Sequence, residues 1–195
     1  MFSSNRRVGL LTGTFDPVHL GHTAMARAAQ SACELDEVWF LTNPAPEHKT
    51  GVMALEDRVA MVRLAVADEP TMREGVPAGG EVSVSHTIAD FELMMSRYPA
   101  TDFVFIVGAD VLSSIDTWED AARARVLQYA AARRAGADET LIDDLRVAWF
   151  DLAEHTGASS RRIQGELRAG KRPAELRDSV STYIWERGLY KYPRN

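Results

Sequence analysis

Hydrophobic and polar positions alternate along this chain between two patterns. Short apolar runs of strand length are separated by longer stretches in which apolar residues recur at helical spacing. This alternation is typical of a parallel sheet with crossover helices. The clearest strand is predicted at 103–107, where five consecutive apolar residues precede a glycine. Such a run is typical of a strand that is buried on both faces.

The same patterns predict the other elements. Further strands are predicted at 8–11, 37–44, 82–84 and 146–152. Helices are predicted at 22–33, 54–68 and 87–97, with two more near the end of the chain, one beginning near 159 and one running from Pro173 to Gly188. The helix at 54–68 has one apolar face, formed by Leu55, Val59, Val62 and Val66. Segment 118–145 allows two interpretations, a helix throughout or a helix with a short strand near Tyr129.

The amino-acid composition limits the classes of protein to which this chain can belong. The 195 residues are 46% hydrophobic and 26% charged, which is ordinary for one globular domain with a full core. A net charge of −6 argues against a general nucleic-acid binder. The single Cys33 excludes an internal disulfide and a thiolate-rich zinc site. The apolar run at 8–11 is too short for a signal peptide or a membrane span, so we expect a cytoplasmic protein that contacts neither membrane nor nucleic acid.

These observations predict one doubly wound, Rossmann-like α/β domain over residues 1–195, with a parallel sheet, flanking helices and a C-terminal helical portion at about 159–190. In such a sheet, ligands bind beyond the carboxyl ends of the strands, where the strand order reverses. The turn after the first predicted strand lies at this edge. Its sequence is GTFDPVHLGH, residues 13–22.

This turn has the residues that a phosphate site needs. Gly13 allows a phosphate to approach the backbone, and Gly21 lies where a helix start presents N–H groups to an anion. His19 and His22 lie near that helix start, where an imidazole donates a hydrogen bond to a phosphoryl oxygen. The alternative is a turn with two solvated histidines.

GTFDPVHLGH resembles the signature of the nucleotidyltransferase superfamily that carries the H-x-G-H motif, and further matches resemble bacterial nicotinate-nucleotide adenylyltransferases. These matches, spread over most of the chain, are PAPEHK (44–49), LEDRVAMV (55–62), SHTIAD (85–90), FIVGADVLSSIDTW (105–118) and SVSTYIWERGLY (179–190). The resemblance implies adenylyl transfer from ATP to nicotinate mononucleotide, with release of pyrophosphate and Mg²⁺ bound with the ATP. It also implies direct in-line transfer without a covalent intermediate.

The resemblance also implies roles for individual residues. His19 and His22 would be catalytic, and Thr87 and Trp118 would bind the acceptor. The implied ATP-binding residues are Gly13, Thr14, Phe15, Gly21, Lys49, Gly108, Asp110, Ser159, Ser160, Arg161 and Arg162. From the residues alone, three of these positions have a second interpretation: Asp110 as a helix N-cap, Trp118 as a core residue and Lys49 as a solvated surface residue.

Two segments depart from the family pattern. The second phosphate motif, I-S-S-T-x-I-R in the family, is ASSRRIQ here, so that Arg161 replaces the threonine and Gln164 the arginine. Either Arg161 or Arg162 takes over the phosphate contact, or triphosphate binding is weaker. Arginine suits bidentate phosphate contacts, which favours replacement. His86 and Ala89 replace a tyrosine and an aspartate of the acceptor subsite.

These departures leave the acceptor open. Nicotinamide mononucleotide, pantetheine phosphate or another small phosphate could accept an adenylyl or cytidylyl group, and a nucleotide-binding regulator without catalysis is a further alternative. The expected partners are ATP and a mononucleotide. The sequence does not determine the oligomeric state, and a homo-oligomer is compatible with it.

Overall fold

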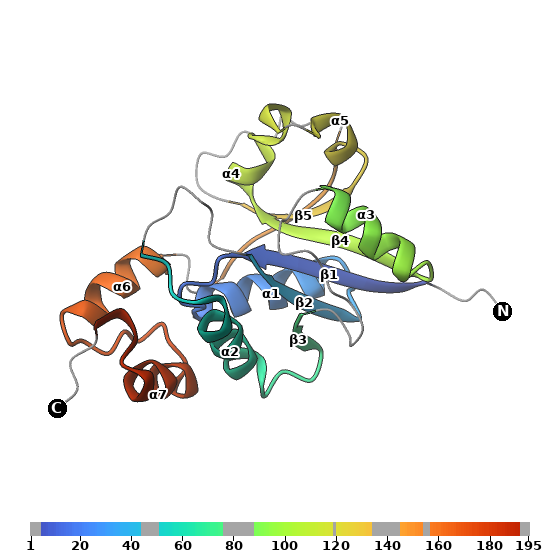
Figure 1. Ribbon diagram of the computed structural model, residues 1–195. Helices are drawn as coiled ribbons and strands as arrows, with labels where there is room; N and C mark the ends of the chain where they lie inside the picture. The colour runs from blue at the N-terminus through green and yellow to red at the C-terminus, as the bar shows by residue number, and fades with distance from the viewer. Residues whose placement is uncertain are drawn as a thin grey trace.

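Six parallel strands form one sheet in the order β3-β2-β1-β4-β5-β6 (Figure 1). The computed structural model describes residues 5–43, 51–75, 88–118, 120–133, 145–153 and 157–191. The strands are β1 (Arg6–Gly13), β2 (Glu37–Thr42), β3 (Met72–Glu74), β4 (Thr101–Gly108), β5 (Gln128–Ala132) and β6 (Arg146–Phe150). The helices are α1 (Leu20–Ala32), α2 (Leu55–Val66), α3 (Ile88–Arg97), α4 (Ala109–Leu112), η1 (Ile115–Thr117), α5 (Ala121–Ala124), α6 (Ser160–Arg168), α7 (Asp178–Arg187) and η3 (Leu189–Lys191). This confirms the predicted parallel α/β sheet with flanking helices.

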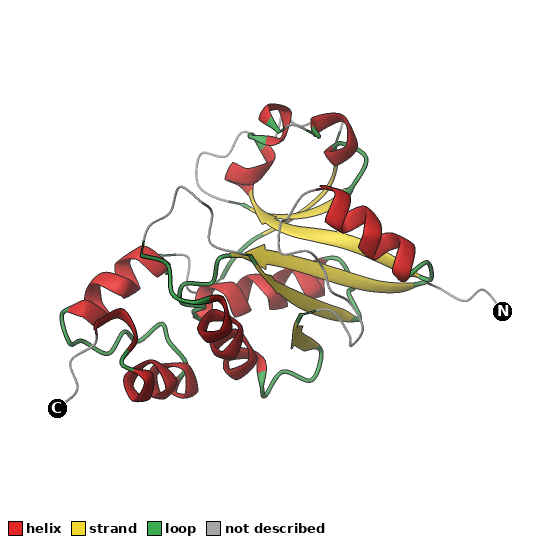
Figure 2. Ribbon diagram, viewed as in Figure 1, coloured by secondary structure: helices red, strands yellow, loops and turns green. Residues whose placement is uncertain are grey.

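Alternate residues of the central strands pack into two separate cores. In β4, Val104 and Ile106 face the core shared with α1, α2, α6 and α7, whereas Phe103 and Phe105 face the core shared with α3, α4 and α5. Figure 2 shows helices on both faces of the sheet. The consecutive apolar run in β4 therefore arises from burial on both faces, as predicted from the sequence.

The strand order reverses beside β1. Its two neighbours are β2 and β4, so the chain winds outward from β1 in both directions. Leu11 lies opposite Ile106, and both strands end two residues later, at Gly13 and Gly108. The two turns predicted to carry ATP-binding residues therefore begin at the same edge of the sheet, at the switch point where ligands bind in open α/β folds.

Several sequence predictions need correction. The last helix begins at Asp178 rather than Pro173, because residues 173–176 form a turn and Arg177 is an extended N-cap. Its predicted end is confirmed by Gly188 in the left-handed conformation. Of the two interpretations of segment 118–145, the helix throughout is wrong, because the residues around Tyr129 form β5, which pairs with β4. The predicted strand at 82–84 lies outside the described residues, and the sequence did not predict β3.

The buried face of α2 also differs from the predicted apolar face. Leu55 and Val59 are only partly buried, whereas the charged residues Asp57 and Arg58 are buried together with Met61. The reason is that this helix packs its first turn against the loops at the carboxyl edge of the sheet. The polar residues there hold those loops, as described below.

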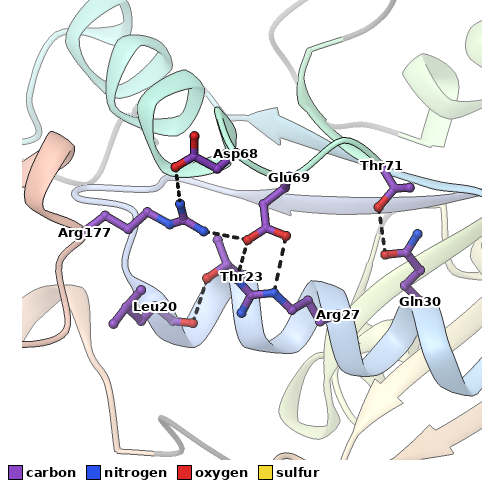
Figure 3. A network of polar contacts seen from close by, with 8 residues as sticks. All are labelled: Leu20, Thr23, Arg27, Gln30, Asp68, Glu69, Thr71 and Arg177. Atoms are coloured by element: carbon purple, nitrogen blue, oxygen red, sulfur yellow. Dashed lines mark hydrogen bonds and ion pairs between the residues drawn. The ribbon is translucent and has the colours of Figure 1, made fainter.

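A polar network anchors α1 from its outer side (Figure 3). Glu69, in the α2–β3 connection, accepts hydrogen bonds from Arg27 of α1 and from Arg177, the residue before α7. Arg27 and Arg177 lower the pKa of the Glu69 carboxyl, since both cations favour its charged form. Leu20, at the start of α1, also donates its N–H to the Glu175 carbonyl oxygen at 2.8 Å. The first helix is therefore fixed to the C-terminal segment.

Among the described residues, no helix has the length and hydropathy needed to cross a membrane.

Candidate active site

Two histidines stack at the start of α1, directly beyond the carboxyl end of β1. His19 is the N-cap residue and His22 belongs to the first turn. Their ring centroids are 3.8 Å apart and the ring planes differ by 27°. The backbone N–H of His19 donates a hydrogen bond to Nδ1 of His22 at 3.1 Å. Helix geometry therefore brings both histidines of the H-x-G-H motif to one place.

The hydrogen bond from His19 determines the tautomer of His22. Because Nδ1 accepts a hydrogen bond, it carries no proton, and the neutral ring holds its proton on Nε2. The ring also contacts Phe15 edge-on, with centroids 5.0 Å apart. Burial, and in second place the neighbouring His19, lower the pKa of His22 well below its usual value. His22 is therefore a neutral Nε2–H donor near pH 7.

We expect NMR to detect this tautomer directly. In the ligand-free protein, ¹⁵N spectra should show His22 protonated on Nε2, with a titration midpoint below 6.5, because the fold favours the neutral form. By linkage, the stabilisation from neutral His22 is complete above pH 6.5 and is lost as pH falls toward the lowered folded-state pKa. Protonation of Nδ1 at pH 7 would contradict this tautomer assignment.

The two glycines of the turn are required by packing against aromatic rings. A Cβ atom at Gly13 would lie 2.9 Å from the Phe15 ring, and one at Gly21 would lie 3.0 Å from Nδ1 of His19. Phe15 itself adopts a positive φ of 47°, which turns its ring back toward Gly13. The missing Cβ atoms of Gly13 and Gly21 therefore leave room for the Phe15 and His19 rings next to the backbone of the turn.

A cavity of about 440 Å³ opens between this turn and α6. Its lining residues are Thr14, Phe15, Asp16, His22, Gly51, Val52, Ser160, Arg161, Gln164 and Arg168. Ser159 is the extended N-cap of α6 and makes no side-chain capping bond. Ser160 donates its hydroxyl to the Pro17 carbonyl oxygen at 3.0 Å, which fixes the start of α6 to the turn. The N-terminus of α6 and His22 therefore border the same cavity.

The structure brings only part of the predicted ATP site together here. Catalytic His22 and the predicted ATP-binding residues Thr14, Phe15, Ser160 and Arg161 line the cavity. The lining does not include Arg162, nor His19, Gly13, Gly21, Ser159 or Gly108. The Arg162 guanidinium forms ion pairs with Glu166 and Glu175. Of the two arginines proposed to replace the motif arginine, the geometry favours Arg161. Lys49 and Thr87, and the altered His86, lie outside the described residues.

Two further predicted residues lie beyond β4. The interpretation of Asp110 as a helix N-cap is wrong, because Gly108 caps α4 and Asp110 is an exposed residue of its first turn. Trp118 is partly buried against the core on that face of the sheet, and its indole N–H donates to Oγ of Ser114 at 3.2 Å. Asp110 and Trp118 follow the strand that is adjacent to β1, and neither lines the 440 Å³ cavity.

Sequence reasoning assigned no role to four residues that hold the turn. Buried Asp16 accepts hydrogen bonds from Tyr190 at 2.6 Å and from Gln164 at 3.0 Å. Buried Arg58 donates to the carbonyl oxygens of Thr14 at 2.6 Å, Asn43 at 2.5 Å and Met53 at 2.9 Å. The sequence signal was present, since Asp16 lies inside the motif and Tyr190 ends the matching GLY segment.

Comparison with known proteins shows which family this chain belongs to. A sequence model of the family described as cytidylyltransferase-like matches residues 10–165, from β1 to α6. The chain belongs to the cytidylyltransferase-like family. This cytidylyltransferase-like protein is 34% identical to a probable nicotinate-nucleotide adenylyltransferase of Gloeobacter violaceus, over 96% of its own length and 97% of the relative's. It is 30% identical to the nicotinate-nucleotide adenylyltransferase of Bacillus subtilis, over 95% and 99% of the two chains. The predicted resemblance is confirmed.

Solved structures share the fold of this cytidylyltransferase-like protein. A nicotinic acid mononucleotide adenylyltransferase of Plasmodium falciparum, solved in complex with NaAD, superposes with a TM-score of 0.80. The match covers 97% of this chain and 100% of that chain, at 14% identity. At this identity the likeness concerns the fold alone.

Proposed function

We propose that this protein transfers the adenylyl group of ATP to nicotinate mononucleotide, forming nicotinate adenine dinucleotide and pyrophosphate. The observation that carries the proposal is the cavity at the switch point of the sheet, which His22, the N-terminus of α6 and Arg161 border together. These groups suit a polyphosphate. The names of relatives that match over nearly their full length support nicotinate mononucleotide as the acceptor.

The reaction is a direct displacement at phosphorus. A phosphate oxygen of the mononucleotide attacks the α-phosphorus of ATP, and the new P–O bond forms as the bond from the α-phosphorus to the bridging oxygen breaks. Pyrophosphate leaves with that oxygen. Because the attacking phosphate is already ionised near pH 7, the step needs no general base. The protein acts through positioning and stabilisation of charge.

In this mechanism His22 is a hydrogen-bond donor rather than a base. Its Nδ1 is engaged by the His19 N–H, so Nε2–H is the group available to a phosphoryl oxygen. Stacking on His19 and the edge contact with Phe15 hold the ring in place before the substrate arrives. A preorganised donor stabilises the charge that develops on the transferred phosphoryl group, at no cost in reorganisation.

Mg²⁺ enters this proposal as part of the substrate. It is bound through phosphate oxygens in many nucleotide sites and retains several waters, so it needs few protein ligands. Within the ranges that the structure describes, no group of three His, Cys, Asp or Glu side chains is arranged to hold a metal. We propose that Mg²⁺ reaches the site bound to ATP, where it neutralises phosphate charge.

The remaining roles are proposed from the family resemblance. Gly108 and Asp110 bind the adenosine, with the Asp110 carboxylate on ribose hydroxyls. Trp118 stacks on the pyridine ring and Thr87 binds its carboxylate, while Lys49 reaches the triphosphate. The position of β4 beside β1 supports the first assignment, since it brings Gly108 to the edge where the histidine turn begins.

Release of pyrophosphate from Mg-ATP, measured with a panel of acceptors, tests this function. We expect turnover with nicotinate mononucleotide and at least tenfold lower kcat/KM with nicotinamide mononucleotide or pantetheine phosphate. Preference for another acceptor would overturn the substrate assignment. ATP binding without turnover on any acceptor would instead support the nucleotide-binding regulator. A His22→Ala protein purified in parallel controls for a contaminating transferase.

A further inference from the structure

The outer wall of the phosphate cavity carries a second arginine that the sequence patterns did not indicate. Arg168 lines the cavity together with Arg161 and His22. It lies four residues after Gln164, hence on the same face of α6. One guanidinium nitrogen of Arg168 donates to Oε1 of Gln164 at 3.2 Å. This arginine is therefore held at the cavity by a residue of its own helix.

Gln164 is itself fixed from the other side. Its amide nitrogen donates to the backbone oxygen of Asp16 at 2.6 Å and to the Asp16 carboxylate at 3.0 Å. Asp16 is buried and receives the Tyr190 hydroxyl at 2.6 Å. Because the amide nitrogen is engaged by Asp16, Oε1 is the atom left to accept from Arg168. Asp16, Gln164 and Arg168 thus form a chain of contacts from the histidine turn to the cavity wall.

The charge of Arg168 is not compensated by a carboxylate within the part of the chain that the structure describes. Neighbouring arginines differ: Arg162 is paired with Glu166 and Glu175, and Arg177 with Asp68 and Glu69. Arg161 and Arg168, both at the cavity, form no such ion pair with described residues. Two guanidinium groups that line one cavity and have no carboxylate partner among the described residues favour a multivalent anion.

We propose that Arg168 binds the triphosphate of ATP and that Gln164 positions the Arg168 side chain. The family motif has an arginine at position 164, and Arg168, one helical turn further along α6, serves in its place. The proposal rests on the proposed function only in naming ATP as the anion. It extends the expectation from the sequence, which considered Arg161 and Arg162 as replacements. Arg161 and Arg168 together present the cationic side of the site.

Binding to the catalytically inert anion tripolyphosphate tests Arg168 without any acceptor. By calorimetry, Arg168→Gln should weaken binding of tripolyphosphate and of ATP about tenfold, as removal of a charge-assisted hydrogen bond predicts. Binding of AMP, which lacks the outer phosphates, should change less than twofold. Arg172→Gln is the matched control, because Arg172 is exposed, follows α6 and does not line the cavity. It should leave all three affinities within twofold.

Two outcomes would overturn the role of Arg168. The first is tripolyphosphate binding by Arg168→Gln within twofold of the parent protein. The second is an equal decrease in Arg172→Gln, which would indicate net charge alone. Neither outcome depends on which acceptor the enzyme uses. Failure of the nicotinate mononucleotide assay with normal tripolyphosphate binding would reject the proposed function and leave the role of Arg168 intact.

Two substitutions at position 164 test the positioning role of Gln164. Gln164→Leu should raise KM for ATP three- to fivefold and leave kcat within twofold, since Arg168 keeps its charge but no longer has its support. In the Arg168→Gln background, Gln164→Arg should restore most of the tripolyphosphate affinity, because position 164 lines the same cavity. No recovery in a double variant that keeps the parent unfolding midpoint would refute the exchange of roles between these two positions.

Discussion

His22→Ala is expected to lower kcat at least a hundredfold while leaving the fold intact. The reason is that the variant removes the Nε2–H donor, and loss of one preorganised donor to a developing oxyanion typically costs about 10²–10³ in rate. The His19 ring remains, but the backbone N–H of His19 loses its acceptor, Nδ1 of His22. Steady-state pyrophosphate release with saturating ATP and nicotinate mononucleotide measures the effect.

His22→Gln separates the chemical role of the side chain from its packing. The glutamine amide keeps an N–H donor, so this variant should retain about tenfold more activity than His22→Ala. Circular dichroism and the thermal midpoint of both variants report whether the sheet is unchanged. A kcat of His22→Ala within tenfold of the parent would remove His22 from the mechanism.

Arg58→Met should destabilise the protein by about 3–5 kcal/mol, the range typical of breaking a buried charged network. Arg58 is 1% exposed and donates to the carbonyl oxygens of Thr14, in the β1–α1 turn, and of Asn43 and Met53, at the two ends of the β2–α2 connection. Methionine has a similar length and recovers apolar contact, but it leaves three partly buried carbonyl oxygens without the donor that Arg58 provides. It also removes the positive charge close to buried Asp16. Leaving buried polar groups unpaired outweighs the gain in apolar packing.

Arg63→Met is the matched control on the same helix. The Arg63 side chain is 70% exposed and pairs with Glu74 at 3.0 Å. An exposed ion pair contributes roughly 0–1 kcal/mol, so this variant should stay within that range. Guanidinium-induced unfolding followed by circular dichroism compares the two. Equal destabilisation in both variants would show that the buried carbonyl contacts of Arg58 contribute no particular stability.

The sheet could be predicted from the sequence because its strands are defined by burial. The run at 103–107 is apolar on both sides, and β4 is buried on both sides, so local pattern and tertiary environment agree. The edge strand β3 escaped prediction because its three residues, Met72–Glu74, include two charged ones. The start of α7 was misplaced because a proline suits a turn as well as a first helical turn.

The candidate site was only partly predictable for a different reason. A motif specifies which residues lie in one turn, so the sequence placed His19 and His22 together near a helix start, and the family resemblance implied their catalytic role. The residues that hold this turn come from distant segments. Arg58 and Tyr190 lie in segments that match the family, but that match alone does not place them at the turn. Gln164 was recognised only as a departure from the phosphate motif of the family. Its role became apparent once the structure showed its contacts with Asp16 and Arg168.

The hydrogen bond between Tyr190 and Asp16 joins residues 174 positions apart. Asp16 also accepts a hydrogen bond from Gln164 of α6, so two contacts of this carboxylate come from the C-terminal segment. The geometry of the histidine turn therefore depends on contacts with the C-terminal helices. Opening of those helices would remove the Asp16 contacts that hold the turn, without breaking any strand pairing of the sheet. The structural integrity of the sheet is thus a poor measure of catalytic competence in this protein.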